Sequence, residues 1–285
     1  MTKISGAAHL AGVVGAPVRQ SLSPLIHNAW IAALGLDAVY VPFELAPDGF
    51  EAFVTGLRGG SARGLNITIP FKERALALAD VADAAATSAG AANLLVFHDN
   101  GKVEARNTDG LGVIAALAEQ APDVDLGEAP VMVVGAGGAA RGAVPALLAA
   151  GALEVIIVNR TPERAKALAA QFGPRVSGHG LTDIAGLLAS PGLILNATSG
   201  GMNDRDHLAL PLERAPASAV VMDMVYKPLL TSLLQHAKRL GLRTVDGLAM
   251  LIGQAAPSFE AFFGVAPPAS VDVRALTLQA LGERP

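Results

Sequence analysis

Short apolar runs alternate along the chain with longer stretches in which Ala and Leu recur at helical spacing. Seven of the runs read as buried β-strands, and they cover residues 10–14, 39–43, 64–67, 131–134, 155–158, 193–196 and 220–223. Strands that alternate with helices are typical of α/β units built on a mostly parallel sheet. The pattern therefore predicts an α/β fold.

Local signals mark several element ends. Ser23 is predicted to cap the first helix, with Pro24 in the first turn, where its missing N–H costs nothing. Asn100-Gly101 lies between two strand-like runs and predicts a β-hairpin turn. From Asp246-Gly247 onward the pattern predicts helices only.

The length of 285 residues favours two domains, each able to bury a core. The stretch 120–130 is polar, contains two prolines and has the character of a boundary loop. The apolar run near the N-terminus is short and broken by His9 and by glycine, which favours a first strand over a signal peptide. No run approaches the ~20 apolar residues of a membrane span.

Composition and charge narrow the class of partner. The chain is 52% hydrophobic and 16% charged, which favours a compact globular protein. The net charge is −4 without any block of Lys or Arg, so a small molecule is a better partner than nucleic acid or a membrane. Cysteine is absent, which excludes disulfides and thiolate metal sites and favours the cytoplasm.

A strand, a glycine turn and a helix start follow one another over residues 131–144, with the spacing G-x-G-x-x-A. Gly135 permits the tight turn, Gly137 lets the backbone approach a pyrophosphate, and Ala140 allows close packing of helix on strand. The phosphates would face the helix N-terminus. The predicted dinucleotide loop comprises Gly135, Ala136, Gly137, Gly138 and Ala139.

The next strand indicates which dinucleotide binds. An NAD enzyme carries Asp or Glu about 20 residues after the turn, for the ribose 2′-hydroxyl. Here the strand ends in Asn159-Arg160-Thr161, and Arg164 follows one turn into the helix. Two arginines suit the 2′-phosphate of NADP(H). The alternative, two solvated surface arginines, stays open at this stage.

The first half of the chain carries candidates for the chemistry. Residues 66–72 place polar side chains at a strand end, followed by Lys72, and Asp109 opens a later helix. Hydride transfer at a carbinol needs a proton carrier, and a lysine held against an aspartate can provide one. From spacing alone, a structural ion pair explains Lys72 and Asp109 equally well.

Nine motifs together resemble the shikimate dehydrogenase family, in family order across nearly the whole chain. They are Ser21-Leu-Ser23-Pro24, residues 66–72, Gly90-Ala-Ala-Asn93, Asn107-Thr-Asp109-Gly110, the glycine turn, Asn159-Arg160-Thr161, Asn196-Ala-Thr198-Ser199, Asp223-Met-Val-Tyr226 and residues 246–254. The resemblance implies an NADP(H)-dependent oxidoreductase that reversibly reduces 3-dehydroshikimate to shikimate, in chorismate and aromatic amino-acid biosynthesis. A homodimer is one assembly it allows, without deciding the oligomeric state.

The resemblance also assigns roles by position. Lys72 and Asp109 become the catalytic pair, both also touching substrate, with Lys72 as proton donor and acceptor. Ser21 and Ser23 would hold the substrate carboxylate. The other implied substrate contacts are Asn66, Thr68, Asn93, Tyr226 and Gln254, and those implied around the nicotinamide and its ribose are Thr198, Ser199, Met224, Gly247 and Met250.

Pattern and resemblance together predict two domains with a central cleft. Residues 1–110 plus 247–285 would form the α/β substrate-binding and catalytic domain, and residues 111–246 a Rossmann-type NADP-binding domain. Closure of the cleft would exclude water around Lys72.

Three positions depart from the family pattern. Ala92 and Leu94 flank Asn93, which removes one hydroxyl near a predicted ligand, and Ala249 stands where glycine is common. A quinate or broad-specificity quinate/shikimate dehydrogenase therefore stays open, although both serines of the Ser-x-Ser motif favour shikimate. A methylenetetrahydrofolate-type dehydrogenase is disfavoured because aromatic residues are only 4%. A non-catalytic NADP(H)-sensing protein would be expected to lose Lys72 or Asp109.

The histidines show no ligand spacing, so no metal site is predicted. They are His9, His27, His98, His179, His207 and His236. His27 lies one helical turn past Ser23, and a packing role is favoured over a role in the pocket.

Overall fold

The structure, a computed structural model, describes residues 4–200 and 209–284. The chain forms two compact units. The first comprises Met1–Thr108 and Gln254–Pro285, and the second comprises Asp109–Gly253. Helix α10, Gly247–Phe263, contains the second boundary between them.

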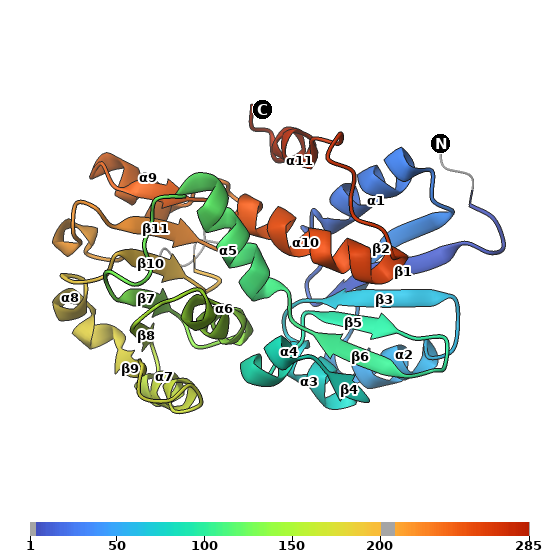
Figure 1. The fold of residues 1–285 in the computed structure, drawn as a ribbon, viewed down its shortest axis with the longest axis horizontal. Helices are drawn as coiled ribbons and strands as arrows, with labels where there is room; N and C mark the ends of the chain where they lie inside the picture. The colour runs from blue at the N-terminus through green and yellow to red at the C-terminus, as the bar shows by residue number, and fades with distance from the viewer. Residues whose placement is uncertain (1–3, 201–208, 285) are drawn as a thin grey trace. The chain divides into compact units, whose positions relative to one another are not determined.

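A six-stranded mixed sheet organises the first unit, in the order β2-β1-β3-β5-β6-β4 (Figure 1). Its strands are β1 (His9–Gly15), β2 (Ala38–Glu44), β3 (Ala62–Ile67), β4 (Val81–Ala82), β5 (Leu94–Phe97) and β6 (Val103–Arg106). Strand β5 runs antiparallel to β3 and β6, and the other pairs are parallel. The helices are α1 (Ser23–Leu34), α2 (Phe50–Gly56), α3 (Lys72–Leu78), α4 (Ala84–Ala89) and α11 (Val273–Leu281), which packs against α1.

A six-stranded, wholly parallel sheet organises the second unit, in the order β12-β11-β10-β7-β8-β9. Its strands are β7 (Val131–Val134), β8 (Val155–Asn159), β9 (Val176–Gly180), β10 (Leu193–Asn196), β11 (Val220–Asp223) and β12 (Arg243–Val245). Its helices are α5 (Asp109–Gln120), α6 (Gly138–Ala149), α7 (Pro162–Ala169), α8 (Ile184–Leu187) and α9 (Ser232–Arg239). The order reverses between β7 and β10, and ligands of such sheets bind at that point beyond the carboxyl ends of the strands.

The central strands of the second unit, β7, β8, β10 and β11, are apolar except at the last residues of β8, β10 and β11, because helices cover both faces of the sheet. Val131 and Val133 of β7 enter one apolar cluster, whereas Met132 and Val134 enter another. This alternation is the two-residue period of a strand with a core on each side. The α/β class and all seven predicted strands are confirmed.

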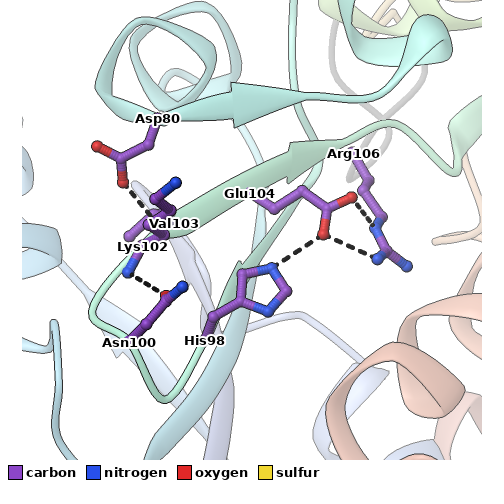
Figure 2. A network of polar contacts seen from close by, with 7 residues as sticks. All are labelled: Asp80, His98, Asn100, Lys102, Val103, Glu104 and Arg106. Carbon is purple, nitrogen blue, oxygen red and sulfur yellow. Dashed lines mark hydrogen bonds and ion pairs between the residues drawn. The ribbon is translucent and has the colours of Figure 1, made fainter.

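The predicted hairpin is also confirmed (Figure 2). The Asn100 side-chain oxygen accepts from the Lys102 backbone N–H at 3.0 Å, and Gly101 has a φ of 78°. The Asp80 carboxylate accepts from the Val103 N–H at 2.7 Å, which ties the start of β6 to the segment before β4. The backbone of the turn and the hydrogen bonds of the Asn100 and Asp80 side chains therefore both support the hairpin.

Some local predictions were wrong. Ser23 lies inside α1 and caps nothing, since Leu22 occupies the cap position without a side-chain bond. By contrast, the prediction of helices only after Asp246-Gly247 is confirmed in the described residues, where α10 and α11 are joined by a loop that contains Pro267 and Pro268. The polar stretch 120–130 is a loop within the second unit, between α5 and β7.

Three strands were not predicted. Strand β4 has two residues, β12 has three, and β9 contains glycine and histidine in place of an apolar run. Within the described residues, no helix is long and apolar enough to span a membrane.

Candidate active site

Asn66 occupies the end of β3 and is held at both ends of its amide. Its Oδ1 accepts from the Tyr40 hydroxyl at 2.8 Å, and its Nδ2 donates to Ser258 Oγ at 2.9 Å. Only 6% of Asn66 is exposed. The strand thus fixes the backbone, and two buried hydroxyls fix the amide.

Asn93 directly precedes β5, the antiparallel strand that pairs with β3. Its Oδ1 accepts from the Thr108 N–H at 2.7 Å, and its Nδ2 donates to Thr108 Oγ1 at 2.9 Å. Its backbone carbonyl accepts from the Ile67 N–H at 2.7 Å. Asn93 therefore links the ends of β3 and β6 while its side chain stays buried.

Gln254 joins this network from helix α10. Its side-chain oxygen accepts from Asn93 Nδ2 at 3.5 Å. Its backbone carbonyl accepts from Ser258 Oγ at 3.0 Å and from Thr108 Oγ1 at 3.2 Å. Three of the predicted substrate residues, Asn66, Asn93 and Gln254, are thus brought together in the first unit by neutral hydrogen bonds.

Lys72 is the first residue of α3, where its backbone carbonyl accepts from the Ala92 N–H at 2.9 Å. Phe71 before it is fully buried and stacks on Phe50 with ring centroids 4.5 Å apart. The helix start is therefore anchored by a rigid core residue, while Lys72 itself is half-buried. Thr68, also half-buried, follows β3 directly.

Ser21 and Ser23 lie at the start of α1. The Ser23 N–H donates to Ser21 Oγ at 3.3 Å, and Ser23 is buried whereas Ser21 is half-buried.

Asp109 and Tyr226 belong to the second unit. Asp109 is 5% exposed and opens α5, one residue beyond the Thr108 that bonds to Asn93.

The glycine turn of the second unit lies at the switch point of its sheet. Gly135 has a φ of 114°, and a Cβ there would meet the Ala197 carbonyl oxygen at 3.0 Å. A Cβ on Gly137 would meet nothing within 4 Å, so the space before α6 is open. Ala140 is fully buried. Each of these positions fits a backbone that approaches a pyrophosphate at a helix N-terminus.

The end of β8 presents the predicted 2′-phosphate residues. Asn159 is half-buried and donates its amide to the Thr161 carbonyl at 3.0 Å. Arg160, Thr161 and Arg164 are exposed. Within the described part of the chain, neither arginine forms an ion pair with an acid. A phosphate would therefore not compete with an internal carboxylate.

Asp223 at the end of β11 organises the predicted nicotinamide loops. It is fully buried, and it accepts from Asn196 Nδ2 at 2.9 Å, the Val225 N–H at 3.0 Å and Thr231 Oγ1 at 2.7 Å. Burial raises the pKa of Asp223, and the three hydrogen bonds oppose that rise. The carboxylate thereby joins three segments at the carboxyl edge of the sheet.

Asn196 in turn orders Thr198. The Asn196 side-chain oxygen accepts from the Thr198 N–H at 3.0 Å and from its hydroxyl at 2.7 Å. Ser199 beside it is exposed.

A Cβ on Gly247 would meet the Met224 carbonyl oxygen at 2.5 Å, so only glycine fits at that close approach. Met224 and Tyr226 are half-buried, and Met250 is 8% exposed.

The described residues contain no cluster of His, Asp or Glu that would hold a metal ion. His27 is fully buried, and His207 lies outside the described residues. Ala92 and Leu94, which depart from the family pattern, are both fully buried.

Several residues of the two networks, Asn196 and Thr231 among them, were missed from the sequence. Tyr40 lies on an apolar strand and resembles an ordinary core residue. Thr108 and Asp223 fall inside the family motifs but received no role. Ser258 follows Gln254 by four residues, a spacing that places both on one helix face and was the available signal.

Sequence models of one family match most of the chain. The shikimate dehydrogenase substrate-binding domain matches residues 13–95, the shikimate/quinate 5-dehydrogenase domain residues 116–224, and the shikimate 5′-dehydrogenase C-terminal domain residues 247–277. The chain belongs to the shikimate dehydrogenase family. Membership confirms the resemblance found in the motifs.

Individual members of the family are similar over their full length. The shikimate dehydrogenase (NADP+) of Caulobacter vibrioides is 58% identical over 98% of each chain. The Thermus thermophilus enzyme crystallised with NADP(H) and shikimate is 36% identical, with a TM-score of 0.82 over 91% of this chain and 95% of its own. The Corynebacterium glutamicum quinate dehydrogenase crystallised with NAD is 29% identical, with a TM-score of 0.84 over 95% and 99%.

Proposed function

We propose that the chain catalyses the reversible, NADP(H)-dependent reduction of 3-dehydroshikimate to shikimate, a step toward chorismate and the aromatic amino acids. The observation that carries the proposal is the buried network of Asn66, Asn93 and Gln254 in the unit that also holds Lys72. A polyol acid needs many fixed donors and acceptors, and these amides provide both. The first unit would bind this substrate and the second the cofactor.

The proton in this reaction is assigned to Lys72. During reduction, the ketone carbon gains a hydride and its oxygen gains a proton from Lys72 Nζ, and oxidation reverses both transfers. NADPH, when bound, supplies the hydride and becomes NADP+. Asp109 is assigned as the second member of the catalytic pair and as a contact of the substrate.

The remaining substrate contacts are divided between the carboxylate and the other polar groups of the substrate. Ser21 and Ser23 are assigned to the carboxylate, and they adjoin one another at the start of α1. Asn66, Thr68, Asn93, Tyr226 and Gln254 are assigned to the remaining polar groups. A site that hydrogen-bonds each hydroxyl rejects analogues that lack one.

The residues of the second unit fit NADP(H). The open space at Gly137 precedes α6, where backbone N–H groups can meet a pyrophosphate. Arg160 and Arg164 are exposed at the end of β8, where a 2′-phosphate would lie. Thr198, Ser199, Met224, Gly247 and Met250 are assigned to the nicotinamide and its ribose.

Steady-state oxidation of shikimate by the wild-type chain tests the proposal. We expect NADPH to form when shikimate and NADP+ are both present, with a much lower kcat/KM for NAD+. Absence of turnover with shikimate at any accessible concentration would contradict the proposal and favour a non-catalytic NADP(H)-sensing protein. Retention of both Lys72 and Asp109 argues against that alternative.

Quinate is the second candidate substrate. Ala92 and Leu94 remove a hydroxyl beside Asn93, and a quinate dehydrogenase is among the structural relatives. The two serines at the start of α1 favour shikimate. The ratio of kcat/KM for shikimate to that for quinate decides, and a ratio near one would indicate a broad-specificity enzyme.

Compartment and assembly complete the proposal. We place the reaction in the cytoplasm, because the absence of cysteine suits a reducing compartment. A homodimer is the assembly that we propose. Light scattering after size exclusion should then give twice the chain mass of 28.9 kDa, and a mass of one chain would contradict the dimer.

A further inference from the structure

Tyr40 lies on β2 and is 1% exposed, in an aromatic cluster of the first unit. Its ring stacks on His27 with centroids 4.1 Å apart and an interplanar angle of 5°. Phe262 lies at 6.2 Å on a tilted plane. These neighbours hold the ring, so the position of the phenol oxygen is fixed by the packing of the ring.

That oxygen contacts Asn66, which is assigned to the substrate. The Tyr40 hydroxyl donates to Asn66 Oδ1 at 2.8 Å. Burial raises the pKa of Tyr40 well above its ordinary value, so the group keeps its proton for this donation. One hydroxyl thereby links β2 to the end of β3.

The hydrogen bond from Tyr40 also decides which way the Asn66 amide faces. The oxygen of the amide meets the Tyr40 donor, and its nitrogen donates to Ser258. If the amide were reversed, its NH₂ group would face Tyr40, and the phenolic proton would have no acceptor there. A buried donor without an acceptor costs more than an ordinary hydrogen bond contributes. The reversed orientation is therefore disfavoured.

We infer that Tyr40 is a positioning residue for the substrate site, which orients the Asn66 amide. The inference rests on the proposed function, because Asn66 is there assigned to shikimate. Tyr40 itself acts only through the Asn66 side chain. Its removal should weaken the recognition of shikimate and leave the cofactor site intact.

Tyr40→Phe is the direct test, since it removes the hydroxyl and keeps the ring stacked on His27. We expect KM for shikimate to rise roughly tenfold, the scale expected when one buried hydrogen bond is removed. The KM for NADP+ should stay unchanged, and kcat should fall less than KM rises. A matched control is Trp30→Phe, which alters the same aromatic cluster because Trp30 packs edge-on against His27 at 5.6 Å.

The control separates positioning from packing. Trp30→Phe should lower the melting temperature but leave KM for shikimate near the wild-type value. Equal rises of KM in both variants, or a KM within twofold of wild type in Tyr40→Phe, would overturn the inference. If the wild type itself does not oxidise shikimate, the proposed function fails and the inference fails with it, which is a distinct outcome.

A second measurement covers the case in which Tyr40→Phe does not fold. The chain has only two tyrosines, Tyr40 and Tyr226, so fluorotyrosine labelling gives two ¹⁹F resonances. Tyr226→Phe identifies the resonance of Tyr40 by leaving it alone in the spectrum. Saturating shikimate should shift that resonance in the wild type. An unchanged Tyr40 resonance, with shikimate bound as shown by a change at Tyr226, would overturn the inference.

Discussion

The two units build their polar interiors differently. In the first unit, Asn66, Asn93 and Gln254 form a network of amides and hydroxyls that carries no charge. In the second, one buried carboxylate, Asp223, accepts hydrogen bonds from three segments. Neutral groups can both donate and accept, which suits a substrate with several hydroxyls. A carboxylate only accepts, which suits a fixed junction of loops.

The chemistry of the two networks, neutral around Asn66 and charged at Asp223, indicates which of them is suited to contact a ligand. A buried charge is costly unless it is fully hydrogen-bonded, and Asp223 has three donors around it. We therefore interpret Asp223 as the scaffold of the cofactor side, and the neutral network as the recognition surface of the substrate side.

Removal of the Asp223 carboxylate should have the largest effect. Asp223→Ala leaves three buried donors without an acceptor, and we expect it to cost about 4 kcal/mol of unfolding free energy. Asp223→Asn keeps the size and one acceptor, and should cost about 1 to 2 kcal/mol. Urea unfolding measures both. Similar costs for the two variants would contradict a junction that depends on accepting hydrogen bonds.

His27 is a second example of an uncharged buried group in the first unit, because burial keeps this titratable side chain neutral. Burial lowers the pKa of His27 to about 3, and within the described residues its ring nitrogens have no hydrogen-bond partner. Between pH 3 and 6.5 the unfolded chain therefore binds a proton that the folded chain does not. Stability is complete above pH 6.5 and falls as the pH is lowered through this window.

We expect this linkage to cost the wild type about 2 kcal/mol between pH 6.5 and pH 5. His27→Phe should not show that decline, because its ring cannot bind a proton. His98→Gln, a change at an exposed histidine, is the control and should keep it. Urea unfolding across this pH range compares the three proteins. A parallel decline in wild type and His27→Phe would show that His27 is not the source.

Substitution of Arg160 tests whether the second unit uses a charged surface residue to recognise the 2′-phosphate of NADP+. Arg160→Ala should raise KM for NADP+ roughly tenfold, because it removes a charge-assisted hydrogen bond to the 2′-phosphate. The KM for NAD+ should not change, since NAD+ lacks that phosphate. Arg19→Ala, at an exposed arginine paired with Glu44, is the matched control. An equal effect on both cofactors would place Arg160 outside phosphate recognition.

The sequence predicted those parts of the fold that depend on burial. Strand β7 could be predicted because both of its faces are apolar, and the turn at Gly135 could be predicted because only glycine fits there. Strand β9 was missed because Gly178 lies against the backbone of Ala165 and Lys166, where a Cβ would approach to 2.4 Å. Close packing of that kind leaves no apolar pattern.

The motifs predicted which residues form the candidate site, but they did not predict the hydrogen bonds that hold those residues in place. The motifs name Asn66, but nothing in them shows that Tyr40 and Ser258 hold its amide. Such partners lie on distant segments and are joined only by the fold. A tyrosine on a buried strand is indistinguishable from packing until the target of its hydroxyl is known.

The central claim is that Lys72 carries the proton in shikimate oxidation, and the kcat of Lys72→Ala tests it most directly. Lys102→Ala, at an exposed lysine in the β5–β6 hairpin, is the matched control. We predict that kcat with shikimate and NADP+ falls by roughly 10²-fold or more in Lys72→Ala, on the scale of the contribution of acid–base catalysis, and stays at the wild-type value in Lys102→Ala. A wild-type kcat in Lys72→Ala would remove Lys72 from the mechanism.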